Sequence, residues 1–203
     1  MKATNLMLIL PFASLFVVCS WAFAQNIPQG FDLFGEFGPS CLYGNVHSSA
    51  TGEAKCEAGR FFGGVGLRLT RHDAIEGSYS YSPDVFNEAY PLVYFNGRLT
   101  SHSVNYVRYL AADPHVQPFA TAGVGYESFQ GIGQTSSGAR VTGDTEFAWN
   151  YGAGIEIIPF RFFAVRFEVR DYAVGIPVFH SSSLHNVVPS LGIVFRCNRN
   201  RKL

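Results

Sequence analysis

The sequence predicts an all-β protein, an eight-stranded antiparallel up-and-down transmembrane β-barrel. Three observations support this prediction: segments in which apolar and polar residues alternate, connections that are alternately long and short, and segment lengths that suit a membrane. An alternation with a period of two is typical of a β-strand. About 9 to 11 tilted residues are enough for a strand to cross the hydrocarbon of a bilayer.

The clearest alternation lies between residues 145 and 175. Apolar side chains such as Trp149 alternate there with small or polar ones, and after a turn near Pro159 apolar residues such as Phe167 alternate with charged residues. This pattern alone does not distinguish a soluble sheet with one wet face from a membrane barrel with a polar interior. The remaining strands and their connections must decide.

Eight strands of this kind are expected along the chain. Their predicted ranges are 31–38, 60–70, 73–81, 98–110, 117–129, 145–158, 161–174 and 185–196. The connections between them are alternately long and short, and in an up-and-down meander all long connections share one end of the barrel. Long external loops and short periplasmic turns are typical of outer-membrane barrels. In the fourth strand Arg108 falls on the apolar face, so we expect it near the strand's end, where facing lipid costs little.

The first 24 residues are predicted to be a secretory signal peptide. Lys2 precedes an apolar run that closes on small residues at Ala24, where cleavage is expected. The barrel would then occupy residues 25–203. Beyond the signal peptide there is no run of about 18 apolar residues, so any membrane crossing must be made by strands.

The charge balance excludes some classes of function. The chain has 15 basic and 15 acidic residues, and removal of Lys2 with the signal peptide leaves 14 basic residues against 15 acidic ones. Such a balance does not favour nucleic-acid binding. His47, His102 and His115 lack the spacing of metal ligands, and no cofactor is expected. The 21 glycines and 15% aromatic residues suit a β-protein with close backbone contacts and a surface rich in rings.

Three cysteines remain after the signal peptide. We expect a disulfide between Cys41 and Cys56, because both lie in one loop-like segment and export leads to an oxidising compartment. Cys197 follows the last strand at the opposite end of the barrel. About 25 Å of apolar band would separate it from the other two, so we expect it to be unpaired.

The segments 117–129, 147–172 and 187–195 resemble the small outer-membrane β-barrel family that includes the OmpA transmembrane domain and OmpX. The resemblance implies the fold and the outer membrane as location, but hardly an activity. It also implies a monomer surrounded by outer-membrane lipids and lipopolysaccharide, assembled by the barrel-assembly machinery through its last strand. The apolar residues of that strand end at Phe195, although residues 196–203 follow. A wall-tethering role is not carried over from this family.

With the apolar faces turned outward, charged side chains collect inside the barrel. An interior of eight strands is just wide enough for side chains, and unpaired buried charges are costly, so opposite charges should pair. The sequence therefore predicts a plugged, salt-bridged interior rather than a wide pore, and this plug accounts for carboxylates that could otherwise act as acid and base of a hydrolase. The predicted network comprises Glu36, Arg68, Glu76, Glu127, Glu156, Arg166, Glu168 and Arg170.

Aromatic residues on the apolar faces could form the girdles that mark the two membrane interfaces. The candidates are Tyr79, Tyr81, Tyr106, Tyr109, Tyr126, Trp149 and Tyr151.

We expect no enzymatic activity, and instead a structural or surface-interaction role through four long external loops, whose ligand the sequence does not name. One alternative is an outer-membrane lipid-modifying enzyme of the lipid A deacylase kind, suggested by His180, His185 and the serines between them. A nucleophilic serine needs a base and an orienting carboxylate within reach, which nearness in sequence does not supply. A second alternative is a secreted soluble ligand-binding β-barrel.

Overall fold

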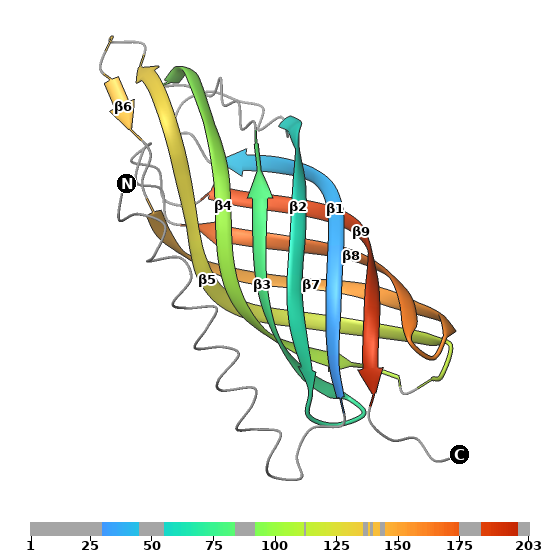
Figure 1. The fold of residues 1–203 in the computed structure, drawn as a ribbon. Helices are drawn as coiled ribbons and strands as arrows, with labels where there is room; N and C mark the ends of the chain where they lie inside the picture. Colours follow the sequence, from blue (N-terminus) through green and yellow to red (C-terminus); the bar gives the residue numbers. More distant parts are fainter. Residues whose placement is uncertain are drawn as a thin grey trace, which may run out of the picture.

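The protein is a closed barrel of antiparallel strands (Figure 1). The computed structural model describes residues 30–44, 55–83, 92–111, 113–135, 138, 140–142, 145–174 and 184–198. The wall is formed by β1 (Gly30–Gly44), β2 (Lys55–Arg68), β3 (Asp73–Ser82), β4 (Leu92–Tyr109), β5 (Val116–Thr135), β7 (Thr145–Phe160), β8 (Phe163–Val174) and β9 (Leu184–Asn198). The short strand β6 (Arg140–Thr142) pairs with the far end of β5. The predicted eight-stranded barrel is confirmed.

Every strand of the wall pairs with its neighbours in sequence, and the first strand also pairs with the last. The order is β4-β3-β2-β1-β9-β8-β7-β5, and an additional pairing of β4 with β5 closes the ring. The β1–β9 seam runs from Gly30 opposite Asn198 to Gly44 opposite Leu184. Closure satisfies the backbone hydrogen bonds that an open edge would leave unpaired in lipid.

The two ends of the barrel differ. Three short connections, over residues 69–72, 110–115 and 161–162, lie at one end, which we call the turn end; the opposite end is the loop end. Side chains stabilise two of these turns. Thr70 Oγ1 accepts a hydrogen bond from the backbone N–H of His72, and Asp113 Oδ1 accepts two, from His115 and Val116. These two N–H donors hold the pKa of Asp113 below its usual value, because they stabilise the carboxylate.

The strands extend further towards the loop end than predicted. β1 continues past residue 38 to Gly44, β5 past residue 129 to Thr135, and β4 begins at Leu92 rather than at residue 98. Asn96 and Gly97, which the predicted ranges leave before the fourth strand, lie inside β4, and the predicted connection over residues 130–144 contains β6. Beyond the membrane a hairpin is held by its backbone hydrogen bonds, so its arms do not need the apolar alternation from which the strand ends were predicted.

The turn end was predicted more closely. β2 ends at Arg68 instead of residue 70, and β8 begins at Phe163 instead of residue 161. The predicted signal peptide, residues 1–24, lies outside the described residues. In the part of the chain that the structure describes, no helix is long and apolar enough to cross a membrane.

The disulfide between Cys41 and Cys56 is confirmed. Both cysteines were expected in a loop. They lie instead opposite each other in the register of β1 and β2. Cys197 is a free, exposed cysteine, and it lies opposite Phe31 near the turn end, far from the other two.

The outer wall of the barrel is apolar. Its large exposed side chains include Leu33, Phe37, Phe61, Val65, Ile75, Val104, Phe167, Val169, Leu191 and Ile193. Of the predicted girdle residues, Tyr79, Tyr106, Tyr126, Trp149 and Tyr151 are exposed on this wall. Tyr109 is a correction: it is buried inside the barrel, because it follows the outward-facing Arg108 in the strand alternation. Arg108 lies near the strand's end, as expected, and pairs with Asp73 at 2.6 Å.

Candidate functional site

The interior of the barrel holds two groups of charged side chains. The first, which we call the inner cluster, lies towards the turn end and comprises Asp32, Glu36, Arg68, Glu76, Glu156, Arg166, Glu168, Arg170 and Arg196. The second, the outer pair, lies closer to the loop end and comprises Arg60 and Glu127. In each strand these charged residues point into the barrel because of the same alternation that turns the apolar residues to the outside.

Arg166 on β8 is the centre of the inner cluster. Its Nη2 lies 2.6 Å from Oε1 of Glu156 on β7 and 2.7 Å from Oε1 of Glu76 on β3, and its Nη1 lies 3.5 Å from Oε1 of Glu36 on β1. The Arg166 side chain is 0% exposed. One guanidinium therefore connects strands on different sides of the barrel.

Two aromatic rings flank this guanidinium. The Phe34 and Phe119 rings each lie with their centroid 5.0 Å from the guanidinium carbon of Arg166. Glycines in the wall make room for them: a Cβ at Gly64 would lie 2.5 Å from Phe34 Cζ, and a Cβ at Gly154 would lie 2.5 Å from Phe119 Cζ. The missing side chains let both rings lie against the wall and pack on the arginine.

The part of the inner cluster nearest the turn end is built around Glu156. Arg68 Nη2 lies 3.3 Å from Glu156 Oε2, and Arg196 pairs with the same oxygen. Arg68 also pairs with Asp32 at 2.7 Å and donates to Tyr109 Oη at 3.1 Å. Glu156 therefore neutralises charge from three strands, including the central guanidinium.

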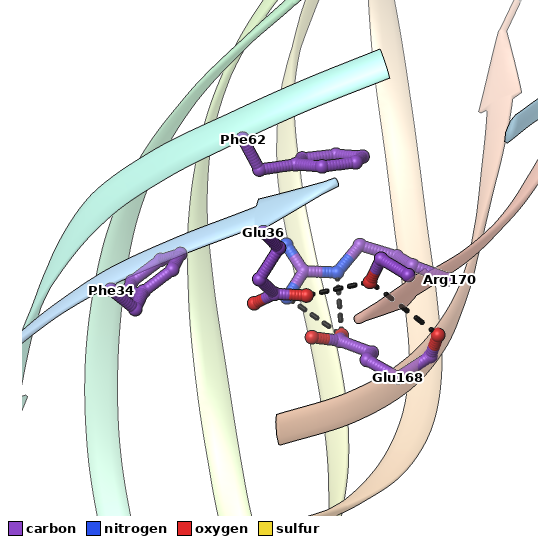
Figure 2. A pocket seen from close by; sticks show the side chains of 6 residues that line it. Phe34, Glu36, Phe62, Glu168 and Arg170 are labelled. Atoms are coloured by element: carbon purple, nitrogen blue, oxygen red, sulfur yellow. Dashed lines mark hydrogen bonds and ion pairs between the residues drawn. The ribbon is translucent and has the colours of Figure 1, made fainter. Parts of the chain in front are cut away.

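On the other side of the cluster, Arg170 pairs with Glu168 at 2.7 Å, and Ser190 Oγ donates to Glu36 Oε2 at 2.6 Å. Figure 2 shows these residues lining a pocket with Phe34 and Phe62. The pocket is too narrow to hold a water molecule. In the whole inner cluster five carboxylates face four guanidiniums, so the charges nearly balance.

The outer pair forms a separate contact. Arg60 Nη2 lies 2.7 Å from Glu127 Oε1 and donates to Ser101 Oγ at 2.6 Å, while Arg60 Nε donates to Ser80 Oγ at 2.9 Å. The guanidinium carbon lies 4.3 Å from the ring centroid of Tyr172. Both charged side chains are completely buried.

The structure places all eight residues of the predicted network inside the barrel, in ion pairs with one another or with residues that were not predicted. Those missed are Asp32, Arg60, Tyr109, Tyr172 and Arg196. Their positions in the alternation contained the signal, since Asp32 and Arg196 share the polar faces of their strands with Glu36 and Gly192. Which of them touch one another depends on the strand register, which the alternation does not give.

A polar group on the outer wall forms a second candidate site, which we call the outer-wall triplet: Tyr151 on β7, Asp171 on β8 and His185 on β9. Asp171 Oδ2 accepts a hydrogen bond from Tyr151 Oη at 2.6 Å and lies 2.8 Å from His185 Nδ1. Because a carboxylate can only accept, Nδ1 carries the proton of this hydrogen bond and Nε2 is left for another partner. His185 was a candidate from the sequence, whereas the carboxylate that orients it was not.

Solved structures with the same fold share little sequence with this chain. Neisserial surface protein A (NspA) has a TM-score of 0.62 at 11% identity, covering 82% of this chain and 96% of that one. Ail, the attachment invasion locus protein of Yersinia pestis, has a TM-score of 0.54 at 14% identity, covering 83% and 99%. The N-terminal β-barrel domain of Pseudomonas aeruginosa OprF has a TM-score of 0.54 at 17% identity, covering 83% and 98%. At these identities the likeness shows the fold alone.

A comparison with curated proteins finds no match. The family model of the outer membrane protein beta-barrel domain matches residues 10–195, which include almost all of the barrel wall. The apolar outer wall and the charged interior agree with a barrel whose surroundings are lipid. The chain therefore belongs to the outer membrane protein beta-barrel family and is located in the outer membrane.

Proposed function

We propose that this protein spans the outer membrane as a non-conducting, non-enzymatic barrel with a structural or surface-interaction role through the segments at its loop end. The observation that carries the proposal is the inner cluster around Arg166, whose guanidinium bridges carboxylates on β1, β3 and β7. A lumen that is closed by paired, buried charges holds the barrel wall together and leaves no path for solutes.

The composition of the loop-end segments narrows the kind of surface partner. Segments 45–54, 83–91, 136–144 and 175–183 contain four acidic residues, Glu53, Asp84, Glu88 and Asp144, against the single basic residue Arg140. One structure of Yersinia pestis Ail contains the heparin analogue sucrose octasulfate. The excess of negative charge in this chain favours a neutral or basic partner over such a polyanion. Within the membrane we propose a monomer in contact with outer-membrane lipids and lipopolysaccharide.

Recording across planar bilayers tests the closed lumen. The folded protein, identified by a gel mobility that changes on heating, is expected to give no steady conductance. A large, steady porin-like conductance would contradict the proposal. Beads coated with polylysine or with heparin test the surface charge: proteoliposomes are expected to bind polylysine more strongly, and preferential binding to heparin would exclude a basic partner.

A second candidate function is the modification of outer-membrane lipids, and the outer-wall triplet is the observation that favours it. Asp171 orients His185 and so supplies the carboxylate that a histidine base requires. Among the described residues, however, no serine hydroxyl is hydrogen-bonded to His185, and the serines at 181–183 lie outside them. Mass spectrometry of lipid A from cells with and without the protein distinguishes the two candidates: a lost acyl chain would establish the enzyme, and unchanged lipid A supports the non-enzymatic role.

A further inference from the structure

The outer wall of the barrel has a tyrosine–aspartate pair near each end, and within the described ranges only one of them is paired with an arginine. Near the turn end Asp73 accepts a hydrogen bond from Tyr106 and pairs with Arg108 at 2.6 Å. Near the loop end Asp171 accepts from Tyr151, but among the described residues no lysine or arginine pairs with it. The following segment, residues 175–183, contains neither of these residue types.

The depth of Asp171 follows from the residues below it on β8. The outward side chains from Phe163 to Val169 are all apolar, and Asp171 is the next outward position. Eight residues of a tilted strand rise about 20 Å, most of an apolar band about 25 Å high. Asp171 therefore lies where lipid acyl chains meet their headgroups, on the loop side of the membrane.

The carboxylate at this depth is short of hydrogen bonds. The side chain of Asp171 is 16% exposed. Its Oδ1 is buried and has no hydrogen-bond partner within the described part of the chain. The carboxylate therefore makes fewer hydrogen bonds than an ionised group can accept, and a group that donates a hydrogen bond to its exposed part would be stabilised.

Aromatic rings lie beside this carboxylate. Trp149, 61% exposed, is opposite Ala173 in the strand register, and Ala173 is opposite His185, so a single methyl group separates the indole from the imidazole along this row. Tyr151 lies directly opposite Asp171. The register thus places a tryptophan and a tyrosine at positions neighbouring Asp171, and a carboxylate combined with aromatic rings can bind an ammonium ion.

We propose that the outer-wall triplet, together with Trp149, binds the primary ammonium group of a membrane lipid headgroup. Asp171 accepts an N–H hydrogen bond from the ammonium, the aromatic rings contact the cation, and His185 and Tyr151 hold the carboxylate in position. Such a group is found both in ethanolamine phospholipids and in amine-bearing glycolipids. The inference goes beyond the proposed function, because it gives the barrel a specific lipid partner.

The fluorescence of Trp149 measures binding at this position, since the exported protein without residues 1–24 has no other tryptophan. The protein is reconstituted into vesicles in which chain-brominated phosphatidylethanolamine or phosphatidylcholine competes with the unbrominated lipids. The two headgroups carry the same ammonium charge, but three methyl groups replace the N–H donors of phosphatidylethanolamine in phosphatidylcholine. Quenching is expected to show about a fivefold preference for phosphatidylethanolamine.

Variants identify the residue responsible. Asp171→Asn is expected to reduce the preference to within about twofold, whereas Asp171→Glu, which keeps the carboxylate, should retain most of it. The matched control is Asp73→Asn, which changes the same kind of pair near the turn end and should leave the preference unchanged. Equal quenching by the two lipids in the unaltered protein, or an undiminished preference in Asp171→Asn, would overturn the proposal. If Asp171→Asn does not fold, the comparison in the unaltered protein still decides.

Unlabelled lipopolysaccharide distinguishes the two sources of the ammonium group. Stronger relief of quenching by lipopolysaccharide than by phosphatidylethanolamine would support the site and assign it to a glycolipid, and the reverse would support it and assign it to a phospholipid. If phosphatidylcholine relieved the quenching as strongly as lipopolysaccharide and phosphatidylethanolamine do, the proposal would be overturned.

Discussion

Arg166 Nη2 and Glu156 Oε1 lie 2.6 Å apart in the barrel interior, and neither side chain has any exposed surface. The same guanidinium reaches Glu76 on the other side of the lumen at 2.7 Å. A charge that is desolvated to this extent is tolerated only when it is paired. The stability of the barrel should therefore depend more on Arg166 than on arginines that are exposed on its surface.

Replacing Arg166 by methionine keeps most of the side-chain volume but removes the charge. Glu76 and Glu156 then lose their central partner, and we expect the free energy of unfolding to fall by about 3 to 5 kcal/mol. Urea unfolding of the protein in lipid vesicles, followed by gel mobility, measures this loss. The control is Arg161→Met on the exposed β7–β8 turn, which should change stability by less than about 0.5 kcal/mol. A similar effect of the two substitutions would contradict the role assigned to Arg166.

Arg60 and Glu127 are expected to behave as one unit. Because both are completely buried and lie 2.7 Å apart, Arg60→Met or Glu127→Leu alone leaves a buried charge without its partner, at a cost of about 3 to 5 kcal/mol. The double variant removes both charges and should lose clearly less than the two single losses together. A double-mutant cycle of unfolding free energies gives the coupling, and strictly additive losses would show that the pair does not act as a unit.

The role of Gly154 is tested by the smallest possible side chain. A Cβ there would lie 2.3 Å from the backbone oxygen of Phe167 and 2.5 Å from Phe119 Cζ, so Gly154→Ala must displace the ring that flanks Arg166. We expect a loss of about 1 to 3 kcal/mol in unfolding free energy. Gly77→Ala is the matched control, since a Cβ at Gly77 meets nothing within 4 Å. Equal stabilities of the two variants would mean that the wall accommodates a side chain at Gly154.

The sequence predicts the barrel because the period of two is a local property that survives in every strand. The same alternation predicts that Glu156, Arg166 and Glu168 face inward, and this prediction does not require their partners to be known. It fails where residue type and phase disagree: Tyr109 was assigned to the membrane interface because it is aromatic, although its phase puts it inside. It also fails for the ends of the strands, since Cys41 lies in a part of β1 whose composition is that of a loop.

Contacts across the barrel could not be predicted in the same way. Arg166 and Glu76 are separated by 90 residues, and their pairing depends on the register of several strands and on the tilt that closes the barrel. The outer-wall triplet has the same origin. In the strand register Asp171 is not opposite His185, and no residue is opposite both of them. The carboxylate reaches the imidazole only because of the way β8 and β9 are placed in the barrel.

The Cys41–Cys56 disulfide and the free Cys197 predict a number of reactive thiols that other cysteine pairings would not give. Without reductant the denatured protein, prepared without residues 1–24, should react with one equivalent of a maleimide, at Cys197, and with three equivalents after reduction. Cys197→Ser should abolish the first reaction, whereas Cys41→Ser should raise it to two equivalents by releasing Cys56. Mass spectrometry of the labelled protein counts the thiols. If Cys197 were protected without reductant in the monomeric protein, its sulfur would have to reach the loop end, which the register of β9 with β1 does not allow.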